Sequence, residues 1–340
     1  MAAPELSKTT LRLNATRTKI MKAGGLADQV YTNNYFYDYL KKMKAIHVGE
    51  YGRGIEFDLL DTGNTTAKEM NRYEKYDTTP GTETRTALFE VKKIGATAVV
   101  DIDSIDENTS DGKVWDIVKV KTGDALDAIQ NRFETDLHAV ASSSKYMLSV
   151  RDLIADDPTA NPTAYNVGGI DRSSSTFSYY RNQYNTTAGV AATWTMATDG
   201  KASMRAMWST CVKNAPKNKG AQMREPKMIV ADWDLVDAYE AIHDSNDLHI
   251  RKDDKVGSGF RHFIYKLNIP VFPDDDANFD GRMYFINTDF FGLYVESKSN
   301  FTLGKWIEPS DQDAHIQKIK VRACLAGSTW KCHGVLYGGS

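Results

Sequence analysis

A long polar stretch constrains this chain more than any other feature of its sequence. Asp61–Thr86 spans 26 residues with almost no aliphatic side chains, and nine of them are charged, five acidic and four basic. Structureless loops of this length are uncommon inside compact domains and usually serve binding or another function. The contacts of this segment are therefore expected outside the core of its own domain.

Two strand-like runs flank the polar stretch and predict a hairpin. Ile55, Phe57 and Leu59 alternate with acidic residues, as in a strand with one covered face. Ala87–Asp103 also alternates, but its apolar parity changes near Lys93–Gly95, which predicts a bulge that bends the strand. A two-stranded ribbon does not stabilise itself in water. A neighbouring chain is the natural support, and a floppy surface insertion is the alternative.

The rest of the chain predicts a mixture of helices and strands. A long amphipathic helix is expected from Trp115 or Thr122 to Ser142, with acidic side chains on its outer faces. A second helix is expected after the cap Thr198–Asp199, and a third after the cap Asp232. The apolar positions of the long helix are Leu126, Ile129, Phe133, Leu137 and Val140. The predicted strands of the later sequence are Met228–Val230, Phe263–Phe272, Met283–Asn287, Phe291–Glu296 and Ile316–Leu325.

Composition narrows the function classes. Of the 340 residues, 41% are hydrophobic and 26% are charged, which is typical of a folded protein. The formal net charge is −3. Proteins that bind nucleic acid through its phosphate backbone carry an excess of basic residues, so the charge argues against that class. No apolar run approaches the roughly 20 residues that span a bilayer. Three cysteines without paired spacing argue against a disulfide framework or a zinc site.

Sequence motifs for catalysis are absent apart from one acidic run. There is no phosphate-binding loop, no paired-histidine zinc motif and no serine nucleophile elbow. Asp276, Asn278, Asp280 and Gly281 fit the first half of a calcium loop, but Asn287 stands at the twelfth position, where the final glutamate would be. A turn is therefore predicted, and no catalytic, cofactor-binding or metal-binding residue is assigned. An acid/base or metal-dependent enzyme using Asp274–Asp280 is kept as an alternative.

Local motifs and the order of the parts resemble one family. Arg72-Tyr73-Glu74-Lys75-Tyr76-Asp77 is followed by Gly168-Gly169-Ile170-Asp171-Arg172 and by Tyr179-Tyr180-Arg181-Asn182. The sequence resembles the major capsid proteins of tailed bacteriophages, whose fold is shared with herpesvirus shells and bacterial nanocompartments. Lys75 and Tyr180 stand where that family has Gly and Trp, which is typical of a divergent member.

The resemblance implies an α+β fold with named parts. The basic segment at the start, with its aromatic end, would be a solvated tail with a docking end or an arm reaching over a neighbouring subunit. The implied parts are an N-terminal arm (1–48), an extended hairpin loop (49–108), a peripheral domain with the long spine helix (109–165), an axial domain (166–290), peripheral-domain strands (291–322) and a return to the axial domain (323–340).

The resemblance also implies a function. Such subunits assemble as hexamers and pentamers into an icosahedral head around double-stranded DNA, which they contact without reading its sequence. The expected partners are other copies, a separate scaffolding protein, a portal protein and, as a further candidate, a decoration protein, with assembly in the bacterial host cytoplasm and no membrane. A shell that packages protein cargo is the alternative. The candidate subunit-contact residues are Lys68, Glu69, Arg72, Tyr73, Tyr76, Asp171, Arg172, Tyr180, Arg181 and Asn182.

Overall fold

The chain divides into two structural units. The structure is a computed structural model that describes residues 35–60, 66–78, 84–107, 117–159, 166–216, 224–244, 263–265, 269–310 and 312–339. The first unit combines Lys93–Thr135 with Val295–Arg322, and the second combines Tyr35–Lys92, Asp136–Tyr294 and Ala323–Ser340. Residues 1–34 of the predicted N-terminal arm lie outside the described residues. Among the described helices, none is long and apolar enough to cross a bilayer.

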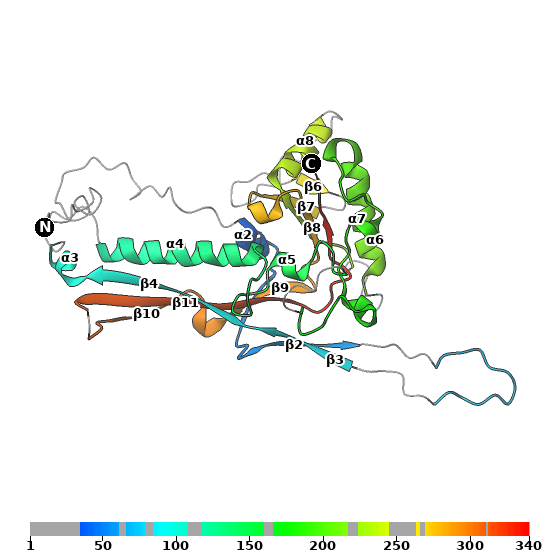
Figure 1. The fold of residues 1–340 in the computed structure, drawn as a ribbon, viewed down its shortest axis with the longest axis horizontal. Helices are drawn as coiled ribbons and strands as arrows, with labels where there is room; N and C mark the ends of the chain where they lie inside the picture. The colour runs from blue at the N-terminus through cyan, green and yellow to red at the C-terminus, as the bar shows by residue number, and fades with distance from the viewer. Residues whose placement is uncertain are drawn as a thin grey trace. The chain divides into compact units, whose positions relative to one another are not determined.

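The first unit is a small sheet covered by one long helix (Figure 1). β11 (Ala314–Gly327) pairs with both β10 (Thr302–Ile307) and β4 (Lys92–Asp101), and α3 (Ile102–Glu107) follows β4. The helix α4 (Ile117–His138) meets the sheet through Thr122, whose Oγ1 lies 3.5 Å from Gln317 Oε1. The strand predicted at Ile316–Leu325 is confirmed, and its central residues alternate: Ile319, Val321 and Ala323 are buried, while Lys318 and Lys320 are exposed.

The long helix differs from its prediction at its C-terminal end. Ile129, Phe133 and Leu137 are buried as predicted, but the helix ends at His138, so Val140 lies beyond it and is 47% exposed. Glu134 and Asp136, which were expected on outer faces, are also buried. The amphipathic pattern misplaces them because it assumes one covered face. The last turn is covered on several sides, as the ring contacts of His138 with Phe36 and Phe279 show.

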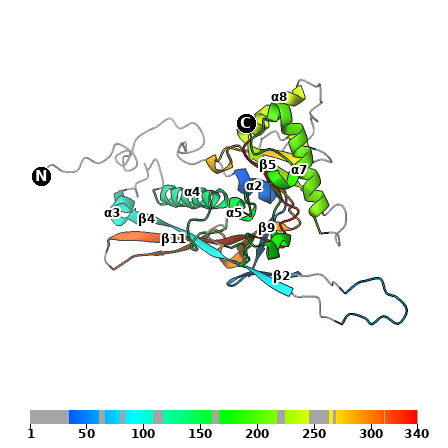
Figure 2. The same ribbon diagram turned by 45° about the vertical axis from the view of Figure 1, so that its right-hand side comes forward.

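The second unit contains a five-stranded sheet in the order β12-β8-β5-β7-β6. Its strands are β5 (Met228–Asp232), β6 (Phe263–Tyr265), β7 (Ile269–Asp274), β8 (Met283–Ile286) and β12 (Gly334–Leu336). β5 runs parallel to β7 and antiparallel to β8. The helices α7 (Lys201–Asn214) and α8 (Trp233–Asp244) lie beside this sheet in both Figure 1 and Figure 2, and their Met204, Met207 and Leu235 belong to its core.

The predicted helix cap at Thr198–Asp199 is wrong. Both residues lie inside a π-helical turn, η2 (Met196–Gly200), which continues directly into α7. The backbone of η2 forms the helical turn that precedes α7, so α7 starts without a side-chain cap. Asp232 stands immediately before α8 as predicted, and its carboxylate accepts a hydrogen bond of 2.7 Å from the Gly281 amide.

Further elements of the second unit are α2 (Tyr35–Lys42), β1 (Ile46–Gly49) and β9 (Phe291–Glu296), and β1 pairs with β9. The short elements α5 (Val150–Leu153), η1 (Ser175–Tyr180), α6 (Asn185–Ala188) and η4 (Ala277–Phe279) lie between them along the chain, and η5 (Ser297–Ser299) belongs to the first unit. Tyr39 stacks on Phe272 and donates a hydrogen bond of 2.9 Å to the Pro273 carbonyl. The end of the predicted arm therefore packs on its own chain.

The predicted hairpin is present. β2 (Gly54–Leu60) and β3 (Thr84–Glu90) pair antiparallel from Gly54↔Glu90 to Leu60↔Thr84 (Figure 1). The change of apolar parity is confirmed, but it falls at Val91, where β3 ends and β4 begins, and not at residues 93–95. The Val91 amide bonds to the Arg53 carbonyl at 3.1 Å, one position beyond the last ladder pair, Gly54↔Glu90.

Candidate subunit-contact site

The polar stretch beyond the hairpin contains an ordered turn at its centre. Residues 66–78 carry no helix or strand, yet the Glu74 carboxylate accepts hydrogen bonds from Lys68 Nζ (2.8 Å) and from the Asn71 amide (2.9 Å). The bond from Lys68, followed by that from Asn71, lowers the pKa of Glu74. The Glu74 amide in turn bonds to the Asn71 carbonyl at 3.1 Å. These contacts fix the chain around Arg72 and Tyr73.

Two tyrosines on this turn are almost fully exposed. Tyr73 is 95% exposed and Tyr76 is 82% exposed. Tyr73 also has a φ of 72°, a left-handed conformation that is unusual for a bulky residue and costs about 1–3 kcal/mol. Lys68, Glu69 and Arg72 are exposed on the same segment. Aromatic side chains shown to solvent in this way are typical of binding surfaces, so the prediction that these five residues contact a neighbour is retained as a proposal.

Three of the other five candidate contact residues are buried in the second unit, whereas Asp171 and Arg181 are partly exposed. Arg172, Tyr180 and Asn182 are 6%, 1% and 1% exposed, so their predicted contact with a neighbouring subunit is wrong. Arg172 donates to the Asp152 and Leu153 carbonyls at 2.6 and 2.7 Å and to Asn182 Oδ1 at 3.2 Å. Burial lowers the pKa of its guanidinium to about 10. Arg172 therefore ties segments of one chain together.

Arg181 and Asp171 also make local contacts. Arg181 donates to the carbonyls of Arg172, Ser173 and Ser174 at 2.6, 2.8 and 3.0 Å. The Asp171 carboxylate accepts from the hydroxyl and amide of Ser173 and does not pair with Arg172. Backbone carbonyl oxygens therefore accept the hydrogen bonds of the Arg181 guanidinium. A bidentate bond to a carboxylate is not needed to account for its position.

The double-glycine motif has a packing role. Gly168 has a φ of 61° and its carbonyl accepts a hydrogen bond of 3.1 Å from the Leu88 amide of β3. A Cβ on Gly168 would lie 2.8 Å from Ala87 Cβ, so only glycine permits this approach. The motif therefore holds the base of the hairpin against its own unit.

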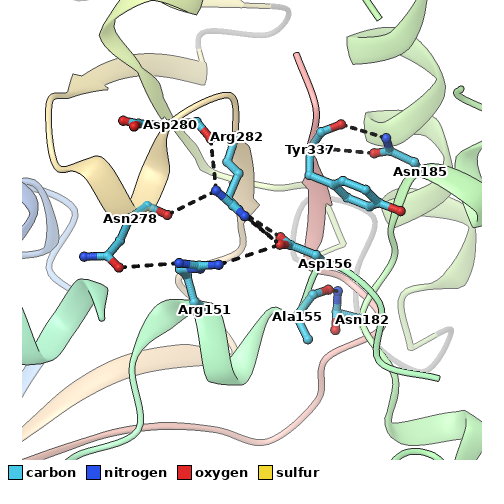
Figure 3. Close-up of polar contacts among 9 residues, drawn as sticks. All are labelled: Arg151, Ala155, Asp156, Asn182, Asn185, Asn278, Asp280, Arg282 and Tyr337. Carbon is cyan, nitrogen blue, oxygen red and sulfur yellow. Dashed lines mark hydrogen bonds and ion pairs between the residues drawn. The ribbon is translucent and has the colours of Figure 1, made fainter. Parts of the chain in front are cut away.

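A second polar network, shown in Figure 3, was not predicted from the sequence. Arg282 forks onto the Asp156 carboxylate with distances of 3.0–3.2 Å, and Arg151 reaches the same carboxylate at 3.9 Å. Arg151 also bonds to Asn278, while Arg282 bonds to the Asp280 carbonyl.

A second long-range contact lies beside this network. The side-chain amide of Asn185 donates to the Tyr337 carbonyl and accepts from the Tyr337 backbone amide. No local sequence pattern distinguishes this network, because the bonds of Asp156 to Arg282, of Arg151 to Asn278 and of Asn185 to Tyr337 each join residues more than a hundred positions apart.

The acidic run forms a turn, as predicted. Asp274 ends β7 and is buried against His138, with 2.9 Å between its Oδ2 and His138 Nε2. Asp276 caps η4 through the Asn278 amide. These carboxylates diverge onto separate partners. No cluster of three or more potential metal ligands occurs among the described residues.

A buried histidine makes the stability of the second unit depend on pH. The Nδ1 of His333 accepts a hydrogen bond of 3.2 Å from the Asn287 amide, and burial lowers the pKa of its imidazole to about 3. Between the unfolded value of 6.5 and about 3, the unfolded chain binds a proton that the folded chain does not, so stability falls as pH falls.

We expect this single group to remove about 2 kcal/mol of unfolding free energy between pH 7 and pH 5. Urea unfolding at several pH values measures the effect. In a His333→Asn variant, whose amide oxygen can still accept from Asn287, the pH dependence should flatten over this window. An unchanged slope would contradict the account.

No protein-family model matches the chain, and no curated protein matches its sequence. Solved structures do match it. The capsid subunit of cyanophage A-1(L) superposes with a TM-score of 0.63 and 14% identity, over 93% of this chain and 96% of that one. The chain has the tailed-phage capsid fold. The capsid of Myoviridae phage XM1 (TM-score 0.55, 6% identity, 94% and 96% coverage) has it too.

An encapsulin also matches the chain. The encapsulin complex of Synechococcus elongatus PCC 7942 matches with a TM-score of 0.53 and 12% identity, covering 98% of this chain and 96% of that one. The capsid fold predicted from the order of the parts is therefore confirmed. The residue bounds assigned to each part remain a prediction.

Proposed function

We propose that this chain is the major subunit of an icosahedral phage head, assembled as hexamers and pentamers around double-stranded DNA. One observation carries the proposal: a phage capsid structure matches 93% of this chain and 96% of its own chain. No large part is left over to suggest another activity. The expected partners are further copies, a scaffolding protein, a portal protein and packaged DNA, with a decoration protein as a further candidate. Assembly is expected in the bacterial host cytoplasm.

The exposed loop supports self-assembly. A turn that fixes its own backbone but exposes two tyrosines is suited to a partner outside the subunit. Each exposed ion pair that such a loop forms contributes on the order of 0–1 kcal/mol. A closed shell repeats the contact many times, so weak contacts become stable together.

A compartment that packages protein cargo is the second candidate, because the encapsulin match covers 98% of the chain. Both candidates are structural shells, and the capsid fold argues against an enzyme. The acidic run offers little to an enzyme either, since Asp274 is buried against His138 and Asp276 caps a turn.

Negative-stain electron microscopy of the purified chain, expressed with and without its neighbouring genes, tests the proposal. We expect closed particles, or rings, tubes and sheets built from hexamers and pentamers. Nuclease-protected double-stranded DNA inside the particles would support a phage head, and a co-purifying protein cargo would support the compartment. A monodisperse monomer or dimer with all neighbouring genes present would contradict both.

A further inference from the structure

The base of the hairpin rests on a buried tryptophan. Trp330 is 0% exposed, and the centroid of its ring lies 6.3 Å from that of Phe89 on β3 and 6.2 Å from that of Tyr180 at the end of η1. The hairpin and η1 therefore share one anchor in the second unit. Phe57 of β2, the ladder partner of Ala87, adds a ring contact of 6.4 Å with Tyr294 at the same level of the ribbon.

A second contact lies farther along the ribbon, toward its tip. The Cζ atom of Arg85 lies 4.7 Å from the ring centroid of Phe177, which is part of η1. This distance is within the roughly 6 Å of a cation–π contact. Arg85 and Phe89 project from the same face of β3, and the four residues between them span about 14 Å. Contacts this far apart determine the direction of the ribbon as well as the place of its base.

Short-range contacts hold the segment that carries Phe177. Ser174 caps η1 by accepting a hydrogen bond of 3.3 Å from the Thr176 amide, and Arg181 donates to the carbonyls of Ser173 and Ser174. Tyr180 buries the other end of η1 against Trp330. The ring of Phe177 is thus positioned by its own unit, and it does not depend on the hairpin for its place.

We propose that Phe177 is a positioning residue, which holds Arg85 and with it the outer half of the hairpin in one direction before subunits meet. The inference rests on the proposed function, because the direction of the hairpin has a consequence only where copies join. A two-stranded ribbon needs support from outside itself, and η1 supplies part of that support within the chain. A hairpin that is already held in one direction loses less conformational freedom on assembly.

Hydrogen exchange of the unassembled full-length chain tests this contact. An exposed cation–π contact changes an equilibrium by about two- to fivefold, so Phe177→Leu should speed amide exchange in β2 and β3 by about that factor. Leucine keeps an apolar side chain but removes the ring face. Phe177→Tyr keeps the ring and should exchange as the unchanged chain does. Exchange in β5 should be the same in all three chains, and an equal increase there would mean a general loss of stability and would overturn the inference.

A double-mutant cycle tests whether Phe177 acts through Arg85. Arg85→Gln alone should also speed exchange in β2 and β3, whereas Arg85→Lys keeps the positive charge and should restore most of the protection. In the Arg85→Gln background, Phe177→Leu should add no further increase, because the contact is already lost. Independent, additive effects of the two substitutions would show that the residues do not act together.

Assembly of the same variants separates the inference from the proposed function. Phe177→Leu should raise the chain concentration needed for particles about two- to fivefold, and Phe177→Tyr should not. Unchanged exchange in the ribbon would overturn the inference and leave the proposed function standing. Faster exchange with unchanged assembly would overturn the role of Phe177 in preparing the hairpin. If the unchanged chain forms no particles, the proposed function fails, while the exchange data still decide whether Phe177 holds the hairpin.

Discussion

Replacing residues 61–83 with Asn-Gly should abolish particle assembly while leaving the subunit folded. Leu60 and Thr84 are directly paired, so a two-residue turn can close the hairpin at this position. Removing 23 loop residues lowers the entropy cost of closing the loop, and the unfolding free energy should rise by up to about 2 kcal/mol. The exposed turn with Tyr73 and Tyr76 is lost at the same time.

The measurement compares particle yield by electron microscopy with urea unfolding of the unassembled chain. A glycine-serine loop of the original length is the matched control, because it keeps the spacing and removes the side chains. We expect it to fail in assembly as well, which would assign the effect to the turn and not to loop length. Closed particles from the Asn-Gly variant would contradict the role given to this loop.

Substituting Arg172 with Met should lower the unfolding free energy by about 3–5 kcal/mol. The change leaves three acceptors without their donor: the Asp152 and Leu153 carbonyls and Asn182 Oδ1. Each buried group left unsatisfied costs about 1–3 kcal/mol. The urea midpoint of the purified chain measures the loss, and a fall in soluble yield should accompany it.

Arg181→Met is the matched control for this prediction. Arg181 also donates to three carbonyl oxygens, those of Arg172, Ser173 and Ser174, but it is only half-buried. Water can replace its bonds, so we expect a loss of about 1 kcal/mol. Equal losses for the two variants would show that burial does not set the role of Arg172.

The arginine motif marks a limit of sequence reasoning. The family resemblance pointed to Asp171, Arg172 and Arg181 as contacts with a neighbouring subunit, but their solvent exposure was not encoded locally. Arg172 is buried because its acceptors come from residues 152, 153 and 182, which only the folded chain brings together. The ion pair of Asp156 with Arg282 could not be predicted for the same reason, since 126 positions separate them.

By itself, the sequence determined the periodic elements and the unusual loop. Alternating residues specified β2, β3 and β11, helical spacing specified α4, and the charged stretch required an exposed loop. These features depend on which face of one element meets a core, which neighbouring residues encode directly. The tertiary structure alone decided that Glu134 and Asp136 are buried, that Arg172 faces inward and that Phe177 lies against Arg85. Those outcomes depend on contacts between distant segments, so no local pattern of side chains carries them.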